Sequence, residues 1–403
     1  MKPGARAAPA FLNSLLAELY ARSALSAQNV GGTRGVVVPP PDFRILLIDD
    51  PARARHVLSR PDVFVKNYAF LDELARGRFS ANGIDWRRRA ALSRPWYRHA
   101  HKTLADGEIT AIYRRHLQDG DRLDGPLLFS RLTDAAVETF SRAIGLPGAL
   151  PWPPRLIDGM RGLLGVRQWI DWNGCSPAEL RELQGELASI REVLQALWQG
   201  CIEGRDAIAQ LESAAEEPLS ATFDAAQELL QNLLASSETT ASTLAWAAEV
   251  LSHQPELQKS LSLDPSGLER FIAEVLRMFP PVPLLTRRCT SDHLLGGQRL
   301  KGGSVLAISI VGIHRNPAYW SLPDVFDMER PEFGADASPV AYLPFSRGER
   351  VCAGMRLAQV ELRCGLEALL GLRYCVPGRV PTQFGYGLSS YPVTTMGATL
   401  RAS

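Results

Sequence analysis

Apolar residues recur at helical spacing over long stretches of this 403-residue chain. The longest such run covers residues 225–251 and ends at a His-Gln-Pro sequence, which is typical of a helix end. At about 1.5 Å per residue the predicted helix is roughly 40 Å long, enough to cross a whole domain. A second run without proline covers residues 353–372, and further helices are predicted for residues 178–211, 256–261 and 268–278. The pattern therefore predicts a largely helical chain.

Short runs of β-branched residues predict a smaller amount of sheet. Residues 35–50 alternate such runs with prolines, and a helix is predicted to begin near Pro51. Further strands are expected around residues 304–310 and in the C-terminal tail. The chain contains no internal repeat or low-complexity tract. By length alone it could form about two or three domains.

The composition is that of an ordinary globular enzyme, with 46% apolar and 22% charged residues. A formal net charge of +1 gives no general case for nucleic-acid binding. The apolar part of the N-terminal segment is short and is broken by Asn13 and Glu18, so it predicts neither a signal peptide nor a membrane span. We therefore expect a soluble, cytoplasmic protein without membrane association.

The chain has six cysteines and no CxxC spacing, so no zinc or iron–sulfur site is indicated. The cysteines interpreted as reduced structural residues are Cys175, Cys201, Cys289, Cys364 and Cys375.

The remaining cysteine, Cys352, lies between closely spaced glycines in the sequence FSRGERVCAG, residues 345–354, directly before a predicted helix. Free N–H groups and the helix dipole favour an anion at a helix N-terminus, so we expect the thiolate form of Cys352 to be stabilised. Gly348 and Gly354 allow special backbone angles or the close approach of a flat, bulky group. A thiolate in this place suits a metal ligand, although a single cysteine is more often a buried apolar residue.

The spacing of this loop resembles the haem-binding loop of the cytochrome P450 family. The positions that the family holds constant are filled by Phe345, Gly348, Arg350, Cys352 and Gly354. The resemblance implies that the cofactor is haem b, with Cys352 as the axial thiolate ligand of the iron. It also implies that Arg350 contacts a haem propionate.

Glu274 and Arg277 stand three residues apart on the helix predicted for residues 268–278, so their side chains share one face. They resemble the Glu-x-x-Arg pair of the same family. Arg330, in the segment FDMERP, matches the arginine that completes a buried Glu-Arg-Arg cluster in that family. The resemblance implies a structural role for all three residues.

Polar residues interrupt the middle of the long apolar run at Glu238, Thr239 and Thr240. Taken alone, they could be a tolerated polar patch. In this context they resemble the oxygen-activating segment of the family, in which Thr239 matches the alcohol and Glu238 the acid that relay protons during dioxygen activation. Ser236 stands where the family usually has glycine. Its hydroxyl either bonds back to a helix carbonyl and helps to bend the helix, or restricts the room above the iron.

The segment NGIDWRRRAALSRPWYR resembles the family's helix that meets the haem propionates. Trp86 can donate its indole N–H, and the arginines at 87–89 can form charge-assisted bonds to carboxylates. The family usually has an arginine four residues beyond the tryptophan, where this chain has Ala90, so which of the three arginines reaches a propionate stays open. Arg287, in LLTRRCTSD, matches another propionate-binding position.

The matches follow the family's order along the chain. They imply one cytochrome P450-like domain over residues 1–403, mainly α with a small β lobe expected within about residues 30–60 and 280–320. The implied activity is that of a soluble bacterial-type haem-thiolate monooxygenase, which uses dioxygen to oxidise, and by default hydroxylates, a small organic molecule.

Such a reaction needs electrons from a ferredoxin or flavodoxin with its reductase, and the basic segment at residues 87–102 suits an acidic donor. No flavin or iron–sulfur module is recognisable after Cys352, so the donor is expected to be a separate protein.

The resemblance assigns the substrate pocket to variable segments at residues 67–82, 152–172, 282–285 and 388–391, with Arg76, Arg78 and Asp171 as polar anchors. Many apolar and aromatic side chains in these segments indicate a mainly apolar small molecule, such as a substrate of secondary metabolism. Two alternatives stay open. One is a peroxide-driven peroxygenase, which the retained pair Glu238 and Thr239 disfavours, and the other is a non-catalytic haem-binding or sensing protein, which the departures at Ser236 and Ala90 allow.

Overall fold

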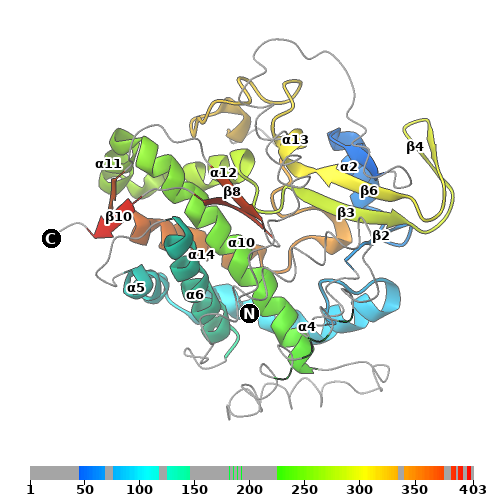
Figure 1. The fold of residues 1–403 in the computed structure, drawn as a ribbon, viewed down its shortest axis with the longest axis horizontal. Helices are drawn as coiled ribbons and strands as arrows, with labels where there is room; N and C mark the ends of the chain where they lie inside the picture. The colour runs from blue at the N-terminus through cyan, green and yellow to red at the C-terminus, as the bar shows by residue number, and fades with distance from the viewer. Residues whose placement is uncertain are drawn as a thin grey trace.

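The computed structural model describes residues 45–68, 76–117, 125–145, 225–334, 340–375, 383–386, 389–393 and 397–400, together with the single helical positions 181, 185, 188 and 192. Helices make up most of the described chain, and the largest sheet lies at one side (Figure 1). The predicted fold class, mainly α with a small β part, is confirmed. The helix predicted for residues 178–211 lies almost wholly outside the described residues, and the pocket segment at 152–172 lies entirely outside them.

Helix α10 (Ala225–His253) runs through the centre of the molecule (Figure 1). It packs against α6 (Gly125–Ala143) and α14 (Met355–Leu370), and α14 also packs on α5 (Asp106–Leu117). Side chains of α10 are buried on all faces over most of its length, as expected for a helix that is apolar all round. The helix predicted from the longest apolar run is therefore confirmed, and its central place explains that run.

The largest sheet has four strands in the order β1-β6-β3-β2. The outer strand β1 (Ile45–Ile48) pairs in parallel with β6 (Val305–Ser309), whereas β3 (Leu284–Cys289) pairs antiparallel with both β6 and β2 (Phe64–Lys66). The sheet thus joins segments more than 200 residues apart in the chain. Two of its strands, β2 and β3, carry side chains toward the cavity described below.

Shorter elements complete the described fold. Helix α2 follows β1 directly, and its N-terminus is capped by the Asp50 carboxylate, which accepts from the Arg53 N–H at 2.8 Å. The remaining elements are α2 (Pro51–Leu58), α4 (Gly83–Thr103), α11 (Pro255–Leu263), η1 (Pro265–Gly267), α12 (Leu268–Met278), β4 (His293–Leu295), β5 (Gln298–Leu300), α13 (Ile310–His314), η2 (Pro331–Phe333), η3 (Gly348–Arg350), β7 (Leu372–Cys375), β8 (Gln383–Tyr386), β9 (Ser390–Val393) and β10 (Gly397–Leu400). Among the described helices, none is both long enough and apolar enough to cross a membrane.

The three residues predicted to form a structural cluster meet in the interior. The carboxylate of Glu274 accepts from Arg277 Nε at 2.7 Å and Nη2 at 2.8 Å, and from Arg330 Nε at 2.8 Å. All three side chains are at least nine-tenths buried. The guanidinium groups use their other N–H groups on backbone carbonyls, including that of His314, which accepts from Arg277 Nη1 at 2.9 Å. The cluster thereby ties α12 to the long segment that precedes the Cys352 loop.

Candidate functional site

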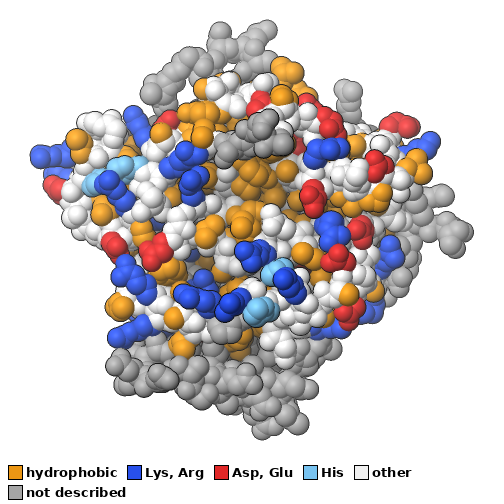
Figure 2. All heavy atoms as spheres, turned by 180° about the vertical axis from the view of Figure 1, so that it is seen from behind, with side chains coloured by type: hydrophobic (Ala, Val, Ile, Leu, Met, Phe, Trp, Pro, Cys, Tyr) orange, Lys and Arg blue, Asp and Glu red, His pale blue; other side chains and the backbone are white. Residues whose placement is uncertain are grey.

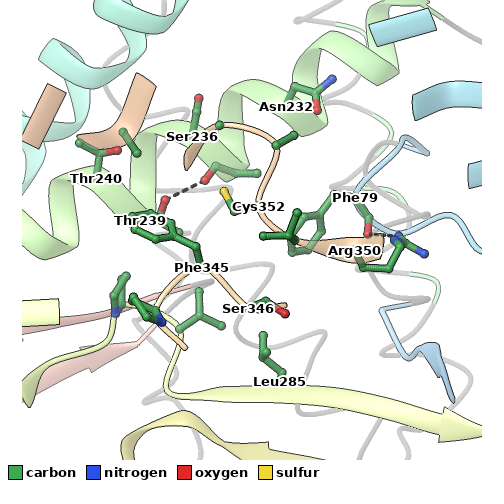
Figure 3. Close-up of a pocket in the computed structure, with 18 of the residues that line it drawn as sticks. Phe79, Asn232, Ser236, Thr239, Thr240, Leu285, Phe345, Ser346, Arg350 and Cys352 are labelled. Carbon is green, nitrogen blue, oxygen red and sulfur yellow. Dashed lines mark hydrogen bonds between the residues drawn. The ribbon is translucent and has the colours of Figure 1, made fainter. Parts of the chain in front are cut away.

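A large cavity lies between α10, α14, α4, β3 and the loop that carries Cys352 (Figure 3). Its empty volume is about 1390 Å³, which includes the solvent-filled space at its mouth. Its apolar and aromatic lining includes Tyr68, Phe79, Phe140, Ala235, Leu276, Val282, Leu285, Ile310, Phe345, Leu357 and Leu362. Such a mainly apolar cavity, lined by segments from across the chain, is typical of a small-molecule or cofactor site.

Cys352 lies in the middle of this cavity beneath α10, with Thr239 and Phe345 to one side and Phe79 and Arg350 to the other (Figure 3). Its backbone N–H donates to the carbonyl of Phe345 at 3.0 Å, which closes the loop. The predicted helix that follows begins at Met355, a few residues later than expected. The five residues named for this loop all lie at or beside the cavity, and all but Gly348 line it.

The backbone conformation and close packing at position 348 explain why glycine is required there. Its φ is +76°, in the left-handed region, and a Cβ there would lie 2.6 Å from the carbonyl oxygen of Leu58. Any other residue would have to move α2 or the loop, because backbone cannot yield as a flexible side chain can. Gly348 therefore fixes the loop against the end of α2.

Cys352 is exposed to the cavity that it lines. Burial raises its pKa above the ordinary value, and this outweighs the backbone hydrogen bond from Gly354 and the charges of Lys66 and Arg78, which lower it. The prediction that the helix N-terminus would hold Cys352 as a thiolate is therefore wrong for the unliganded chain, because desolvation dominates. A bound metal ion would displace the proton, since the thiolate is the ligating form.

Cations that are buried or partly buried converge at one end of the cavity. They are Lys66, Arg78, Arg287 and Arg350. Burial, followed by repulsion from neighbouring cations, lowers the pKa of Lys66 well below its usual range and that of Arg350 to about 9. Burial also lowers the pKa of Arg287. Within the described part of the chain none of the four forms an ion pair, so this end of the cavity suits a ligand with acidic groups.

Each cation is nevertheless held in place. Lys66 Nζ donates to the carbonyl of Phe79 at 2.9 Å and lies 3.9 Å from the centre of its ring. Arg350 donates to the carbonyl of Ala81 at 2.9 Å, and its guanidinium lies 4.5 Å from the centre of a Trp86 ring. These contacts orient the cations before any ligand binds.

The arginines at 87–89 do not line the cavity. Arg87 is exposed and pairs with Asp62 at 3.2 Å and with Glu349 at 3.6 Å, and Arg88 is also exposed. Arg89 is buried, but Asp85 at 2.9 Å and Glu228 at 3.1 Å already bind it.

The other predicted positions at this end, Trp86, Arg287 and Arg350, do line the cavity. Sequence reasoning missed Lys66, for which a lysine within the apolar strand sequence VFVK was the available signal, and it assigned Arg78 to the substrate.

The two residues of the predicted oxygen-activating pair point in different directions. Thr239 lines the cavity, and its hydroxyl donates to the carbonyl of Ala235 at 2.9 Å (Figure 3). Glu238 is 1% exposed, is not part of the lining, and accepts from the Ser389 N–H at 3.2 Å and hydroxyl at 3.3 Å. Ser236 lines the cavity, and its hydroxyl bonds back to the Leu233 carbonyl at 3.0 Å, one of the two outcomes expected for it.

A buried carboxyl group that the sequence did not reveal also borders the cavity. Glu361, on α14, accepts from the Tyr113 hydroxyl at 2.8 Å and is also hydrogen-bonded to Thr240. Burial raises its pKa to about 8, against the opposing effect of these two hydrogen bonds. At neutral pH the group is therefore mostly protonated, and it can donate as well as accept a hydrogen bond.

These features fit haem b. The iron would take the Cys352 sulfur, the two propionates would meet the buried cations, and the apolar lining suits the flat macrocycle. In the described residues no group of three or more His, Cys, Asp or Glu could hold a metal ion by itself.

Comparisons with known proteins point the same way. The family model for cytochrome P450 matches residues 267–372. The leukotriene-B4 omega-hydroxylase 3 of Mus musculus is 38% identical over 160 residues, which cover 34% of this chain and 30% of that protein. The cyclooctatin synthase of Streptomyces melanosporofaciens is 34% identical over 163 residues, covering 36% of each. The chain thus spans about a third of the length of the curated relatives it matches.

The likeness in fold extends much further than the likeness in sequence. The crystal structure of CYP175A1 from Thermus thermophilus superposes with a TM-score of 0.72 at 23% identity, over 98% of both chains. The architecture is therefore that of a cytochrome P450 along nearly the whole chain. The segment around Cys352 is thus similar to the cytochrome P450 family, and the likeness over the rest of the chain is one of fold.

Proposed function

We propose that this protein is a haem-thiolate monooxygenase that oxidises, most simply by hydroxylation, a mainly apolar small organic molecule. One observation carries the proposal: Cys352, the buried cations and Thr239 surround the same, largely apolar cavity. The relatives named as an omega-hydroxylase and as cyclooctatin synthase are consistent with this class of reaction. Bound haem supplies the redox chemistry by which one atom of dioxygen enters the substrate and the other leaves as water.

The residues of this chain would divide the remaining work. Cys352 would bind the iron, and Arg287, Arg350 and Trp86 would orient the propionates. The Thr239 hydroxyl, which borders the cavity, would hold and pass on protons at the oxygen-binding side. The Glu238 carboxylate is hydrogen-bonded to Ser389, so Glu238 would take part in proton transfer only if its side chain turned away from Ser389.

The electron donor is proposed to be a small acidic protein, a ferredoxin or flavodoxin with its reductase. Lys, Arg and His side chains gather on the face shown in Figure 2. The exposed basic residues of α4 are Arg87, Arg88, Arg94, Arg98, His99 and Lys102. A positive surface of this kind would attract an acidic donor and orient it.

The first test is the difference spectrum of the reduced protein with and without carbon monoxide, comparing wild type with Cys352→Ala. A strongly red-shifted band that is absent from the variant supports thiolate ligation by Cys352. Turnover with a ferredoxin and its reductase then tests the donor. Activity with peroxide alone would favour the peroxygenase, while haem binding without product in any ligand screen would favour a sensing protein. Retention of Thr239 in the cavity favours the monooxygenase over both.

A further inference from the structure

One face of α4 runs along the cavity. Trp86, Ala90, Ser93 and Tyr97 follow each other at intervals of three and four residues, so their side chains share this face. Trp86 and Tyr97 line the cavity, whereas Ala90 is buried and too short to place a polar group there. The face therefore supplies no cation between its two aromatic residues.

Arg78 reaches this face from a neighbouring loop. Its Nη1 donates to Ser93 Oγ at 3.1 Å, and its guanidinium carbon lies 5.1 Å from the centre of the Tyr97 ring. Ser93 is one helical turn beyond Ala90, so the guanidinium lies about 5 Å along α4 from the position where a longer residue 90 would project. The Arg78 side chain thus places a positive charge beside the part of α4 where Ala90 provides none.

The Arg78 guanidinium also belongs to the Cys352 end of the cavity. Arg78 lines the same cavity as Cys352 and Arg350. The charge of Arg78 also lowers the pKa of Lys66, although less than the charges of Arg350 and Arg287 do. Arg78 therefore belongs to the same cluster of cations as Lys66 and Arg350.

Side chains of α10 hold the backbone of the Arg78 loop in a fixed position. The acceptors are Gln227 Oε1 for the Arg76 N–H at 2.9 Å, the Glu228 carboxylate for the Arg78 N–H at 2.9 and 3.0 Å, and Gln231 Oε1 for the Phe79 N–H at 2.7 Å. Gly77 makes this contact possible, because a Cβ there would lie 2.7 Å from Gln231 Oε1. Since Glu228 binds the backbone of Arg78 and the guanidinium of Arg89, the Arg78 guanidinium keeps donors for a ligand.

We infer that Arg78 binds a propionate of haem b and takes the place of the arginine that the family usually has at the position of Ala90. This inference rests on the proposed function. A carboxylate beside Arg78 and Arg350 would accept the N–H donors that no acidic residue of the described chain accepts, and a guanidinium can bind it through two parallel hydrogen bonds. The competing assignment is an anchor for an acidic substrate.

The test is the rate at which haem passes from the ferric protein to excess apomyoglobin. Arg78→Gln should release haem at least about tenfold faster than wild type, because a charge-assisted hydrogen bond is lost. Arg76→Gln is the matched control: Arg76 was expected to be a polar anchor of the pocket but does not line the cavity. It lies in the same loop, is 42% exposed and pairs with Asp85 at 3.4 Å, so the release rate of the variant should equal that of wild type. The midpoint potential of the haem should fall in Arg78→Gln alone, because a nearby cation favours the reduced state.

A relocation variant sharpens the test. Adding Ala90→Arg to Arg78→Gln should restore slow haem release, because the charge returns to the same place from α4. A double variant as fast as Arg78→Gln would show that positions 78 and 90 do not share a site, and would overturn the replacement. If Arg78→Gln does not fold, Arg78→Lys serves instead. Lysine keeps the charge but cannot form two parallel hydrogen bonds, so this variant should still release haem faster than wild type.

Unchanged haem release and potential in Arg78→Gln, or in Arg78→Lys where the glutamine variant does not fold, would overturn the inference. A selective loss of affinity for acidic substrates would then assign Arg78 to the substrate. Failure of the proposed function is recognised separately, since wild type would then lack the red-shifted carbon monoxide band. Failure of the inference leaves that band intact in wild type and variant alike.

Discussion

The substitution Glu274→Gln tests directly whether the buried cluster of Glu274, Arg277 and Arg330 stabilises the fold. The carboxylate of Glu274 accepts hydrogen bonds from Arg277 at 2.7 and 2.8 Å, from Arg330 at 2.8 Å and from the Asp327 N–H at 2.9 Å. Glutamine keeps the volume but removes the charge, so two buried guanidinium groups lose their counter-ion. Loss of one partner from a buried pair costs about 3–5 kcal/mol.

That cost is large relative to the whole stability of a typical protein, about 5–15 kcal/mol. The free energy of unfolding should therefore fall by about a fifth or more, and the purified variant should contain less haem per chain. Urea unfolding followed by circular dichroism measures the first quantity, and the carbon monoxide spectrum per protein measures the second.

Glu329→Gln is the matched control. Glu329 pairs with Arg270 at 3.1 Å, but the two side chains are 63% and 50% exposed. Removing such a surface pair should cost less than about 1 kcal/mol. If Glu274→Gln were as stable as Glu329→Gln, the reasoning that the buried cluster depends on the Glu274 charge would be refuted.

Three further predictions concern the cavity and its loop. Thr239→Ala should keep haem and its spectrum but release a larger share of reducing equivalents as peroxide, because the hydroxyl that lines the cavity is gone. Thr133→Ala, which removes a buried hydroxyl from α6 that does not line the cavity, should leave coupling unchanged, and unchanged coupling in Thr239→Ala would contradict its assignment. Glu361 has a folded pKa of about 8, above the ordinary carboxyl value, so ionisation of the unfolded chain destabilises the fold as pH rises from about 5 to 8. Glu361→Gln should therefore gain stability relative to wild type over that range, by at most about 1.4 kcal/mol per pH unit, and a difference independent of pH in urea unfolding would contradict the raised pKa. Gly348→Ala should lose about 2 kcal/mol or more, through its positive φ and the contact with the Leu58 carbonyl, whereas Gly303→Ala, at φ +88° with no atom within 4 Å, should show only the backbone part; equal losses measured by thermal unfolding would show that the contact does not matter.

Local patterns were enough to predict the elements and motifs whose residues lie close together in the chain. The helix at residues 268–278 coincides with α12, and the spacing of Glu274 and Arg277 placed both on one face before the fold was known. The loop around Cys352 could be predicted in the same way, because its motif residues lie close together in the chain and directly precede a helix. Arg330 was found only through the resemblance, since no local pattern connects it with Glu274.

Packing between distant segments decided which charged side chains reach the cavity. Arg89 meets Glu228, 139 positions away, and is thereby withdrawn from the site, while Glu238 meets Ser389, 151 positions away. Burial by the whole fold also reversed the expected shift in the pKa of the Cys352 thiol, because desolvation outweighed the nearby helix end.

The sequence by itself therefore determined the helical framework, the Cys352 loop and the resemblance to a known family, all of which depend on short-range periodicity and spacing. Only the tertiary structure decided that Lys66 and Arg78 join Arg287 and Arg350 in the cavity, that Glu361 is buried beside it, and that Glu238 faces away. The physical reason is that a side chain's charge state and ligand depend on the dielectric surroundings and partners that packing brings together, and these are not encoded in neighbouring residues.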